Sequence, residues 1–209
     1  MQEIHRIPLN PIKNLWNPQR STHHLFPDAP PPLPPPTRPH LLQAKAAKEK
    51  ADAAAAEIGA KAKEQGVDGN IVGLENGEAA KATEVVVVCL PPEYTKGTLE
   101  GISDSFTDQV VISPVVPMQF GKVVSYNPPE AGSSAVEIQN TLPDTVKVVS
   151  AYHNIPAKGL ANFEKPLDYD VVICGDDDDA KALVVKLTEE MPNLKAIDAG
   201  SLEVSSMIE

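Results

Sequence analysis

The sequence contains few cysteines, fewer basic than acidic residues and no long apolar run, and each shortage excludes a class of protein. Its 209 residues include only Cys89 and Cys174, which are too few for a disulfide framework. The 18 basic and 29 acidic residues give a formal net charge of −11. This balance argues against binding of nucleic acid, whose phosphates require a basic face. No apolar run approaches the roughly 20 residues that cross a bilayer, so we expect no membrane partner.

Residues 1–40 differ in composition from the rest of the chain. They hold 11 of the 21 prolines and four of the five histidines. Residues 30–36 read PPPLPPP, which favours polyproline helix or disorder because proline has no backbone N–H. Such a segment can dock into an aromatic groove, and His23 with His24 could suggest a metal, but no second ligand pair has matching spacing. We therefore expect a disordered leader over residues 1–40 and a folded domain over residues 41–209.

The start of the chain also bears on where the protein resides. The first residues, MQEIHRIPLNPIKN, have no apolar core of the kind that signal peptides carry. Cys89 and Cys174 each lie in a run of β-branched residues, which is typical of small buried side chains rather than of paired cysteines. Free thiols persist in a reducing compartment, so we expect a cytoplasmic protein.

From residue 41 onward, helical patterns alternate with short apolar runs. The expected helices span residues 43–65, 76–82, 95–105, 133–140 and 178–191, and the expected strands span residues 70–73, 85–90, 109–113, 146–151, 170–174 and 194–198. Continuous runs such as Val85 to Leu90 are typical of strands buried on both faces of a parallel sheet. The alternation predicts an α/β fold, a three-layer sandwich with a mainly parallel sheet.

The loops that follow the predicted strands are the places to look for a site. In parallel sheets ligands bind beyond the carboxyl ends of the strands. We therefore expect the loops after Leu90, Ser113, Ala151, Cys174 and Asp198 to gather at one edge of the sheet. Most of these loops are apolar and stiffened by proline. They favour a dry slot for stacked rings over a site for acid–base hydrolysis.

Two polar segments allow a functional and a structural interpretation. The acidic run at residues 176–179 could suggest a divalent ion, but it directly precedes a predicted helix, where carboxylates cap free N–H groups. Spaced oxygen ligands of the calcium-loop kind are absent from the sequence, so we expect no metal site. Ser133 and Ser134 stand at another predicted helix start. They could receive a phosphate-bearing group or serve as N-caps, and both interpretations remain open.

Six segments, taken in order, carry a resemblance to a known family: VVVVCLP, VVISPVVPM, GSSAVEI, VVSAYHNIPA, DVVICGDDDDAK and LKAIDAGSLEVSSMIE. Together they resemble the NADPH-dependent F-420 reductases, which are oxidoreductases acting on reduced coenzyme F-420 and NADP. No single segment decides the match, but the ordered combination of VVISPVVP, HNIPA and CGDDDDAK is specific. The resemblance covers roughly residues 43–209. It implies a Rossmann-like enzyme that transfers a hydride between the deazaflavin coenzyme F-420 and NADP.

The resemblance implies cofactor contacts for six residues in three loops: Leu90, Pro91, Val116, Pro117, His153 and Ile155. The first two would lie by the ribose and nicotinamide of NADP, and the other four would hold the two rings face to face. The prolines could instead simply end strands, and the histidine could be structural. No residue receives an acid–base role, because hydride transfer is the cofactors' own chemistry. The expected partners are these small-molecule cofactors, with a homodimer as a possible assembly.

The chain departs from the family at both ends. The family opens with a strand and a Gly-Gly-Thr-Gly turn that binds the pyrophosphate, and a second strand ends in Ser-Arg for the 2′-phosphate of NADP. Here the first glycine is Gly59, and the proline-rich leader stands in place of this first βα unit. Family members also continue into further helices beyond the position of Glu209. Two alternatives remain: a non-catalytic or truncated fragment without the nucleotide site, and a related Rossmann imine reductase, which HNIPA matches less well.

Overall fold

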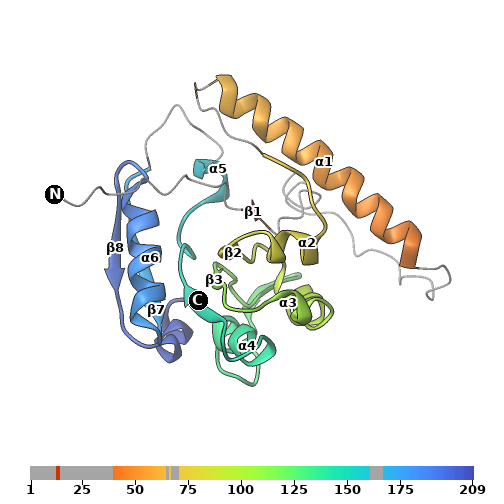
Figure 1. Cartoon of the computed structure of the whole chain (residues 1–209). Coiled ribbons are helices and arrows are strands. Elements are labelled where there is room, and N and C mark those ends of the chain that lie inside the picture. The colour runs from red at the N-terminus through yellow and green to blue at the C-terminus, as the bar shows by residue number, and fades with distance from the viewer. Residues whose placement is uncertain (1–12, 15–39, 65, 67–70, 161–166) are drawn as a thin grey trace. The chain divides into compact units, whose positions relative to one another are not determined.

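The computed structural model describes residues 13–14, 40–64, 66, 71–160 and 167–209 (Figure 1). The chain divides into two compact units. Unit 1 comprises Met1–Pro11 and Asn17–Glu75, and unit 2 comprises Ile12–Trp16 and Asn76–Glu209. Most of the predicted leader lies outside the described residues. The boundary that we place between residues 40 and 41 therefore stays a prediction.

The described part of unit 1 is mainly one helix, α1 (His40–Glu64). Its Ala, Lys and Glu residues are strong helix formers, and most of its described side chains are exposed. An exposed ion pair with 2.8 Å between Lys61 Nζ and Glu57 Oε1 spans one helical turn. The strand expected over residues 70–73 does not form in residues 71–73. Gly73 instead lies so close to the backbone of Ala51 that a side chain would clash there.

Unit 2 is built on a sheet with the strand order β1-β2-β3-β6-β7-β8. The strands are β1 (Lys13–Asn14), β2 (Val85–Val87), β3 (Val110–Ser113), β6 (Lys147–Ser150), β7 (Tyr169–Gly175) and β8 (Leu194–Asp198). The first four run parallel to one another, and β8 runs parallel to β7. This mainly parallel, Rossmann-like sheet confirms the predicted fold class.

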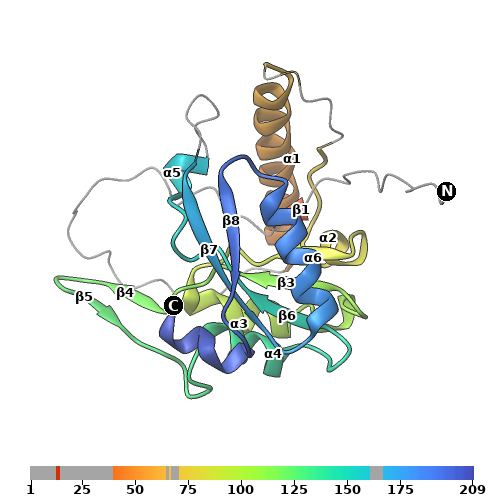
Figure 2. The ribbon, with the colours of Figure 1, turned by 90° about the vertical axis from the view of Figure 1, so that its left-hand side faces the viewer.

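The pairing of β6 with β7 is antiparallel, which the sequence did not predict. Val149 pairs with Gly175 and Ser150 pairs with Cys174, so β7 and β8 run against the other four strands (Figure 2). The expectation that five loops gather at one edge is therefore wrong for two of them. The loops after β7 and β8 leave toward the opposite edge from the loops after β2, β3 and β6.

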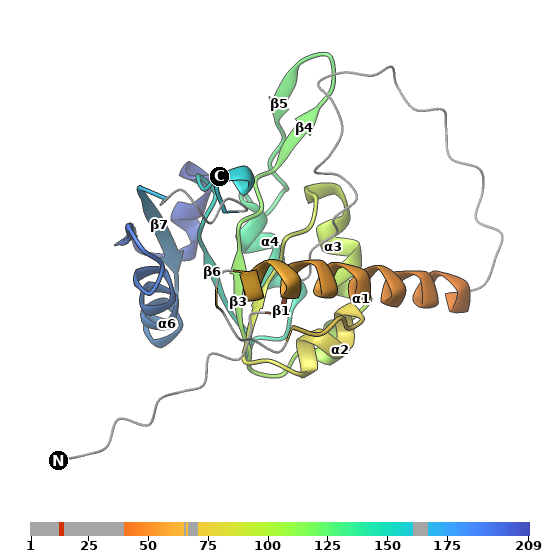
Figure 3. The same cartoon turned by 90° about the horizontal axis from the view of Figure 1, so that it is seen from above.

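Helices cover both faces of this sheet, as the three-layer prediction requires. The helices α2 (Asn76–Lys81), α3 (Pro92–Glu100) and α4 (Ser134–Thr141) contribute to one apolar cluster, and α6 (Asp178–Glu189) contributes to the other (Figure 3). Alternation along the strands divides their side chains between the clusters: Val86 and Val111 face the first, and Ile112 and Val149 face the second. The sheet is thus the shared middle layer of one core.

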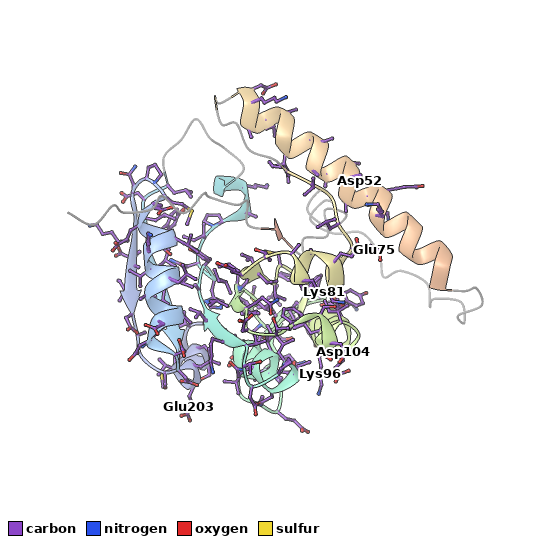
Figure 4. All side chains as sticks on the ribbon, in the orientation of Figure 1. Asp52, Glu75, Lys81, Lys96, Asp104 and Glu203 are labelled. Carbon is purple, nitrogen blue, oxygen red and sulfur yellow. The ribbon has the colours of Figure 1, made fainter. Side chains whose placement is uncertain are left out.

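Shorter elements complete unit 2. They are the 3₁₀ turns η2 (Ser103–Ser105) and η3 (Leu202–Met207), the helix α5 (Ala157–Leu160), and a hairpin of β4 (Met118–Phe120) and β5 (Val124–Tyr126). Charged side chains such as those of Lys81, Lys96, Asp104 and Glu203 are exposed at the surface of this unit (Figure 4). Within the described residues, no helix combines the length and apolar character needed to span a membrane.

Candidate functional site

Three parallel strands bring the predicted site loops to one edge of the sheet. Val87 pairs with Ile112 across β2 and β3, and Ser113 pairs with Ser150 across β3 and β6. The loops that follow these strands therefore leave the sheet side by side. They carry the six predicted site residues: Leu90, Pro91, Val116, Pro117, His153 and Ile155. The expectation that these loops share an edge is confirmed, because it depends only on the parallel part of the sheet.

His153 lies over the ends of β3 and β6. Its Nε2 is 3.5 Å from the hydroxyl oxygen of Ser150, and the ring also forms a hydrogen bond with the backbone of Ser113. Both serines are fully buried. The Nδ1 atom of the ring is buried as well, and it has no hydrogen-bond partner among the described residues. A buried nitrogen without a partner is costly, so this atom is a candidate for contact with a bound ligand.

Burial keeps the imidazole of His153 uncharged. It lowers the pKa from 6.5 to about 4, because desolvation disfavours the protonated ring, and the hydrogen bond with Ser113 offsets only part of this effect. At neutral pH the ring therefore has one donor and one acceptor nitrogen and no net charge. Such a ring can orient a ligand without placing a positive charge beside it.

The backbone preceding His153 adopts an uncommon conformation. Tyr152 has φ of 68°, in the left-handed region that bulky residues rarely enter. The tyrosine hydroxyl is 2.7 Å from the hydroxyl of Thr188 on α6, which ties this turn to the helix layer. Strained backbone held by a tertiary contact is frequent at functional sites. The turn sends Tyr152 into the cluster beside α6 and leaves His153 over the strand ends.

The other predicted residues do not all converge on one point. Leu90 packs against the cluster of α2, α3 and α4, whereas Ile155, 8% exposed, belongs to the cluster on the opposite face. Pro91 precedes the first residue of α3, and its carbonyl accepts hydrogen bonds from that helix, including one from Thr95 Oγ1 at 3.1 Å. Val116 is half-buried and Pro117 is buried. These residues border the edge, and two of them also have structural roles.

The start of α4 answers the open question about the serines. The hydroxyl oxygen of Ser133 accepts the N–H of Val136 at 3.1 Å, so Ser133 is an N-cap. The next two free N–H groups, of Ser134 and Ala135, donate to the carboxylate of Glu209 at 2.7 and 3.0 Å. An anionic group does lie at this helix N-terminus, where the dipole favours it, but it is a side chain of the chain itself.

The acidic run serves as a helix start, as predicted. Asp177 Oδ1 accepts the N–H of Ala180 at 2.9 Å and caps α6, and Asp176 Oδ1 accepts the N–H of Leu202. No group of histidine, cysteine and carboxylate side chains able to hold a metal ion occurs in the described part of the chain. A shallow groove along α6, lined in part by Lys181, Lys186 and Asp198, contains none of the six predicted residues.

Sequence reasoning missed three residues that shape this edge: Ser113, Ser150 and Tyr152. The sequence predicts a strand that ends at Ser113 and a strand over residues 146–151 that includes Ser150, without a role for either hydroxyl. A signal was available, because each serine interrupts an apolar run at its carboxyl end, where a buried hydroxyl needs a partner. The structure supplies that partner for Ser150 in the ring of His153. Nothing in the sequence indicated the left-handed conformation of Tyr152.

Comparison with known proteins identifies relatives. The model of the family described as NADP oxidoreductase, coenzyme F-420-dependent, matches residues 41–117. An F-420-dependent NADP reductase from Methanocaldococcus jannaschii is 37% identical over 78% of this chain and 74% of its own length. The enzyme of the same name from Methanothermobacter marburgensis is 32% identical over 68% of this chain, which spans 65% of that relative.

Solved structures agree on the fold. A structure from Arthrobacter described as that of an F-420-dependent NADP reductase aligns with a TM-score of 0.57 and 22% identity, over 63% of this chain and 61% of its own. A hypothetical protein from Sinorhizobium meliloti aligns with a TM-score of 0.55 and 18% identity, over 78% of this chain and 80% of its own. At these identities the likeness supports the Rossmann-like fold alone.

Proposed function

Because this chain belongs to the family of coenzyme F-420-dependent NADP oxidoreductases, we propose that it is an enzyme transferring a hydride between reduced coenzyme F-420 and NADP. The observation that carries this proposal is the environment of His153. Its neutral ring lies over the strand ends, with one buried nitrogen that has no hydrogen-bond partner among the described residues. Two stacked rings need orientation and exclusion of water, and this edge provides apolar loops for both.

We assign the contacts of the two cofactors to the loops that share this edge. Leu90 and Pro91 would lie beside the ribose and nicotinamide of NADP. Val116, Pro117 and His153 would lie along the deazaflavin ring, with Ile155 supporting the loop from the core. The residues fit this task, because Pro117 and Ile155 are buried and rigid, and His153 offers a polar atom without a partner. The cofactors supply the hydride chemistry, and the chain binds and orients them.

The NADP half of the site should be weaker than the deazaflavin half. The sequence has no glycine before Gly59, so it offers no glycine-rich turn for the pyrophosphate ahead of α1. Each missing charge-assisted hydrogen bond removes about 1.5–3 kcal/mol. Two such losses weaken binding by about two to four orders of magnitude. The alternative of a fragment without catalytic activity rests on this same absence, and NADP binding with a micromolar dissociation constant would count against it.

The compartment and the assembly are also part of this proposal. Cys89 and Cys174 are free thiols, which fits a reducing cytoplasm. We expect a homodimer, because apolar side chains on β4 and β5 are exposed, and exposed apolar patches commonly mark association surfaces.

Fluorescence of coenzyme F-420 provides the test of the deazaflavin half. Addition of the protein should quench it, and His153→Ala should weaken the affinity about tenfold, the equivalent of one hydrogen bond. Asn154→Ala is the matched control, because this neighbour is exposed and directs its side chain to the backbone of Asp170. Absence of quenching by the wild-type protein, or equal affinity of the His153→Ala variant, would contradict the assignment.

Calorimetric titration with NADPH provides the test of the nucleotide half. Weak or undetectable binding is expected from the missing turn. A micromolar dissociation constant would show that another segment replaces the turn, and would remove the basis of the fragment alternative.

A further inference from the structure

Tyr152 lies between strand β6 and the turn that carries His153. The residue before it, Ala151, is still bound to the sheet, because its N–H donates to Ser113 O at 3.1 Å. The residues after it form a turn that is closed by a hydrogen bond of 3.2 Å from Ile155 N to Tyr152 O. The backbone angle at Tyr152, a φ of 68°, therefore sets the direction in which the turn leaves the sheet.

This backbone angle is unfavourable for a tyrosine by itself. Bulky residues rarely enter the left-handed region, and they persist there only where the surrounding structure holds them. An extended backbone at Tyr152 would be free of strain, but it would redirect the turn and carry the ring of His153 away from the strand ends. The turn therefore has an unstrained alternative, and a contact elsewhere must favour the observed state.

That contact is a pair of hydrogen bonds leading to helix α6. Thr188 Oγ1 donates to Val184 O, one helical turn earlier, at 2.8 Å. A hydroxyl has a single hydrogen, so Tyr152 donates the 2.7 Å bond that joins the two hydroxyl groups. Thr188 is fully buried, and its helix contributes Ala180 and Val184 to the apolar cluster on that face of the sheet. The acceptor is therefore fixed by the helix layer and not by the loop itself.

We propose that Tyr152 and Thr188 are positioning residues, whose hydrogen bond holds the turn in its left-handed state and so keeps His153 over the ends of β3 and β6. This inference rests on the proposed function, because it concerns the edge to which coenzyme F-420 is assigned. Loss of the bond that leaves about one tenth of the molecules positioned, with the remainder binding as weakly as His153→Ala, lowers the affinity for coenzyme F-420 about fivefold.

Two substitutions remove this bond while retaining the shape of the side chains. Tyr152→Phe deletes the donor and leaves no buried hydroxyl hydrogen without an acceptor, because Thr188 still donates to Val184. Thr188→Val deletes the acceptor. Thr141→Val is the matched control, since this threonine makes the same kind of bond to a carbonyl one turn earlier, that of Glu137 at 2.7 Å, within α4.

The first measurement is an NMR titration of the His153 ring in the full chain without cofactor, with the signal assigned by its loss in His153→Ala. The pKa of about 4 in the wild-type protein should rise toward 6.5 in Tyr152→Phe and Thr188→Val, as the ring leaves its buried place. Thr141→Val should keep the wild-type pKa. A purely structural bond would change stability and leave this pKa unchanged in the folded protein. A wild-type pKa in both Tyr152→Phe and Thr188→Val would therefore overturn the proposal.

The second measurement is the affinity for coenzyme F-420, from quenching of its fluorescence. Tyr152→Phe should weaken it about fivefold, and the same substitution in the His153→Ala protein should have no further effect, because a positioning residue acts through the ring. Unchanged affinity in Tyr152→Phe, or an equal loss with and without His153, would overturn the proposal. If the wild-type protein does not bind coenzyme F-420 while the pKa still rises in the variants, the proposed function fails and the positioning of His153 stands.

Discussion

Protonation of His153 provides a direct thermodynamic test of its environment. The folded chain holds the pKa of this ring at about 4, against 6.5 for an ordinary histidine. Between these two pH values His153 is protonated in the unfolded chain and neutral in the folded chain. Stability is therefore full above about pH 6.5 and falls as the pH drops toward about 4. At about 1.4 kcal/mol per pH unit the loss approaches about 3 kcal/mol, and residual exposure of the ring reduces it to about 2 kcal/mol.

The substitution His153→Gln isolates this contribution, because glutamine is of similar size and does not titrate. Urea denaturation of both proteins between about pH 7 and about pH 4 gives the two unfolding free energies. Carboxylates, including Glu209 with its raised pKa, titrate in both proteins and cancel in the difference. The advantage of the wild-type protein over the variant should shrink by about 2 kcal/mol across this range. A difference that stays constant with pH would show that His153 is freely solvated, and would remove the argument for a neutral buried ring.

Three further predictions concern the surrounding fold. Ser133→Ala should lower the unfolding free energy by about 1–2 kcal/mol, since Val136 and Ser205 both lose a partner; no change in denaturation midpoint would refute the cap. Leu99→Ala should cost about 2–5 kcal/mol, because this side chain of α3 is fully buried; a cost below about 1 kcal/mol would mean that the helix is loosely packed. Cys89, whose pKa burial raises to about 11, should react slowly with iodoacetamide in the folded chain and quickly in urea; equal rates would contradict its burial.

Local patterns predicted most of the elements of unit 2. The run at Val85 and the three Val-rich segments after it became strands because β-branched residues pack well on a sheet buried on both faces. Helix α6 begins where the acidic run predicts, because Asp177 supplies the acceptor that the first free N–H groups need. These features depend on neighbours in the sequence, and the sequence is sufficient to find them.

The hairpin escaped prediction for a different reason. Its strands are three residues each, and the alternation of M-Q-F and V-S-Y around Gly121 was a usable hairpin signal. Pro114 and Pro117 favoured a proline-stiffened loop in this region instead. Pro117 lies immediately before the first residue of β4, where the absence of a backbone N–H removes no hydrogen bond of the strand. The candidate association surface therefore went unnoticed at the sequence level.

The direction of β7 marks the limit of arguments from apolar runs. A strand buried on both faces has the same composition whether its neighbour runs with it or against it, so the run at residues 170–174 could not decide the matter. The length and content of the connection between β6 and β7 could have indicated the direction of β7. A parallel return needs a crossover, usually a full helix, and the chain between Ser150 and Tyr169 was assigned no helix and forms only the four-residue α5 in its described part.

That reversal changes which residues can act together. The run at residues 176–179 and the turn after Asp198 meet at the far edge, where Gly175 N donates to Gly200 O and Asp176 holds the backbone of Leu202. Carboxylates that a parallel sheet would have brought beside the ring site are instead used to start α6 and to fix η3. The antiparallel pairing of β6 with β7 therefore keeps the acidic run at residues 176–179 away from the ring-binding edge.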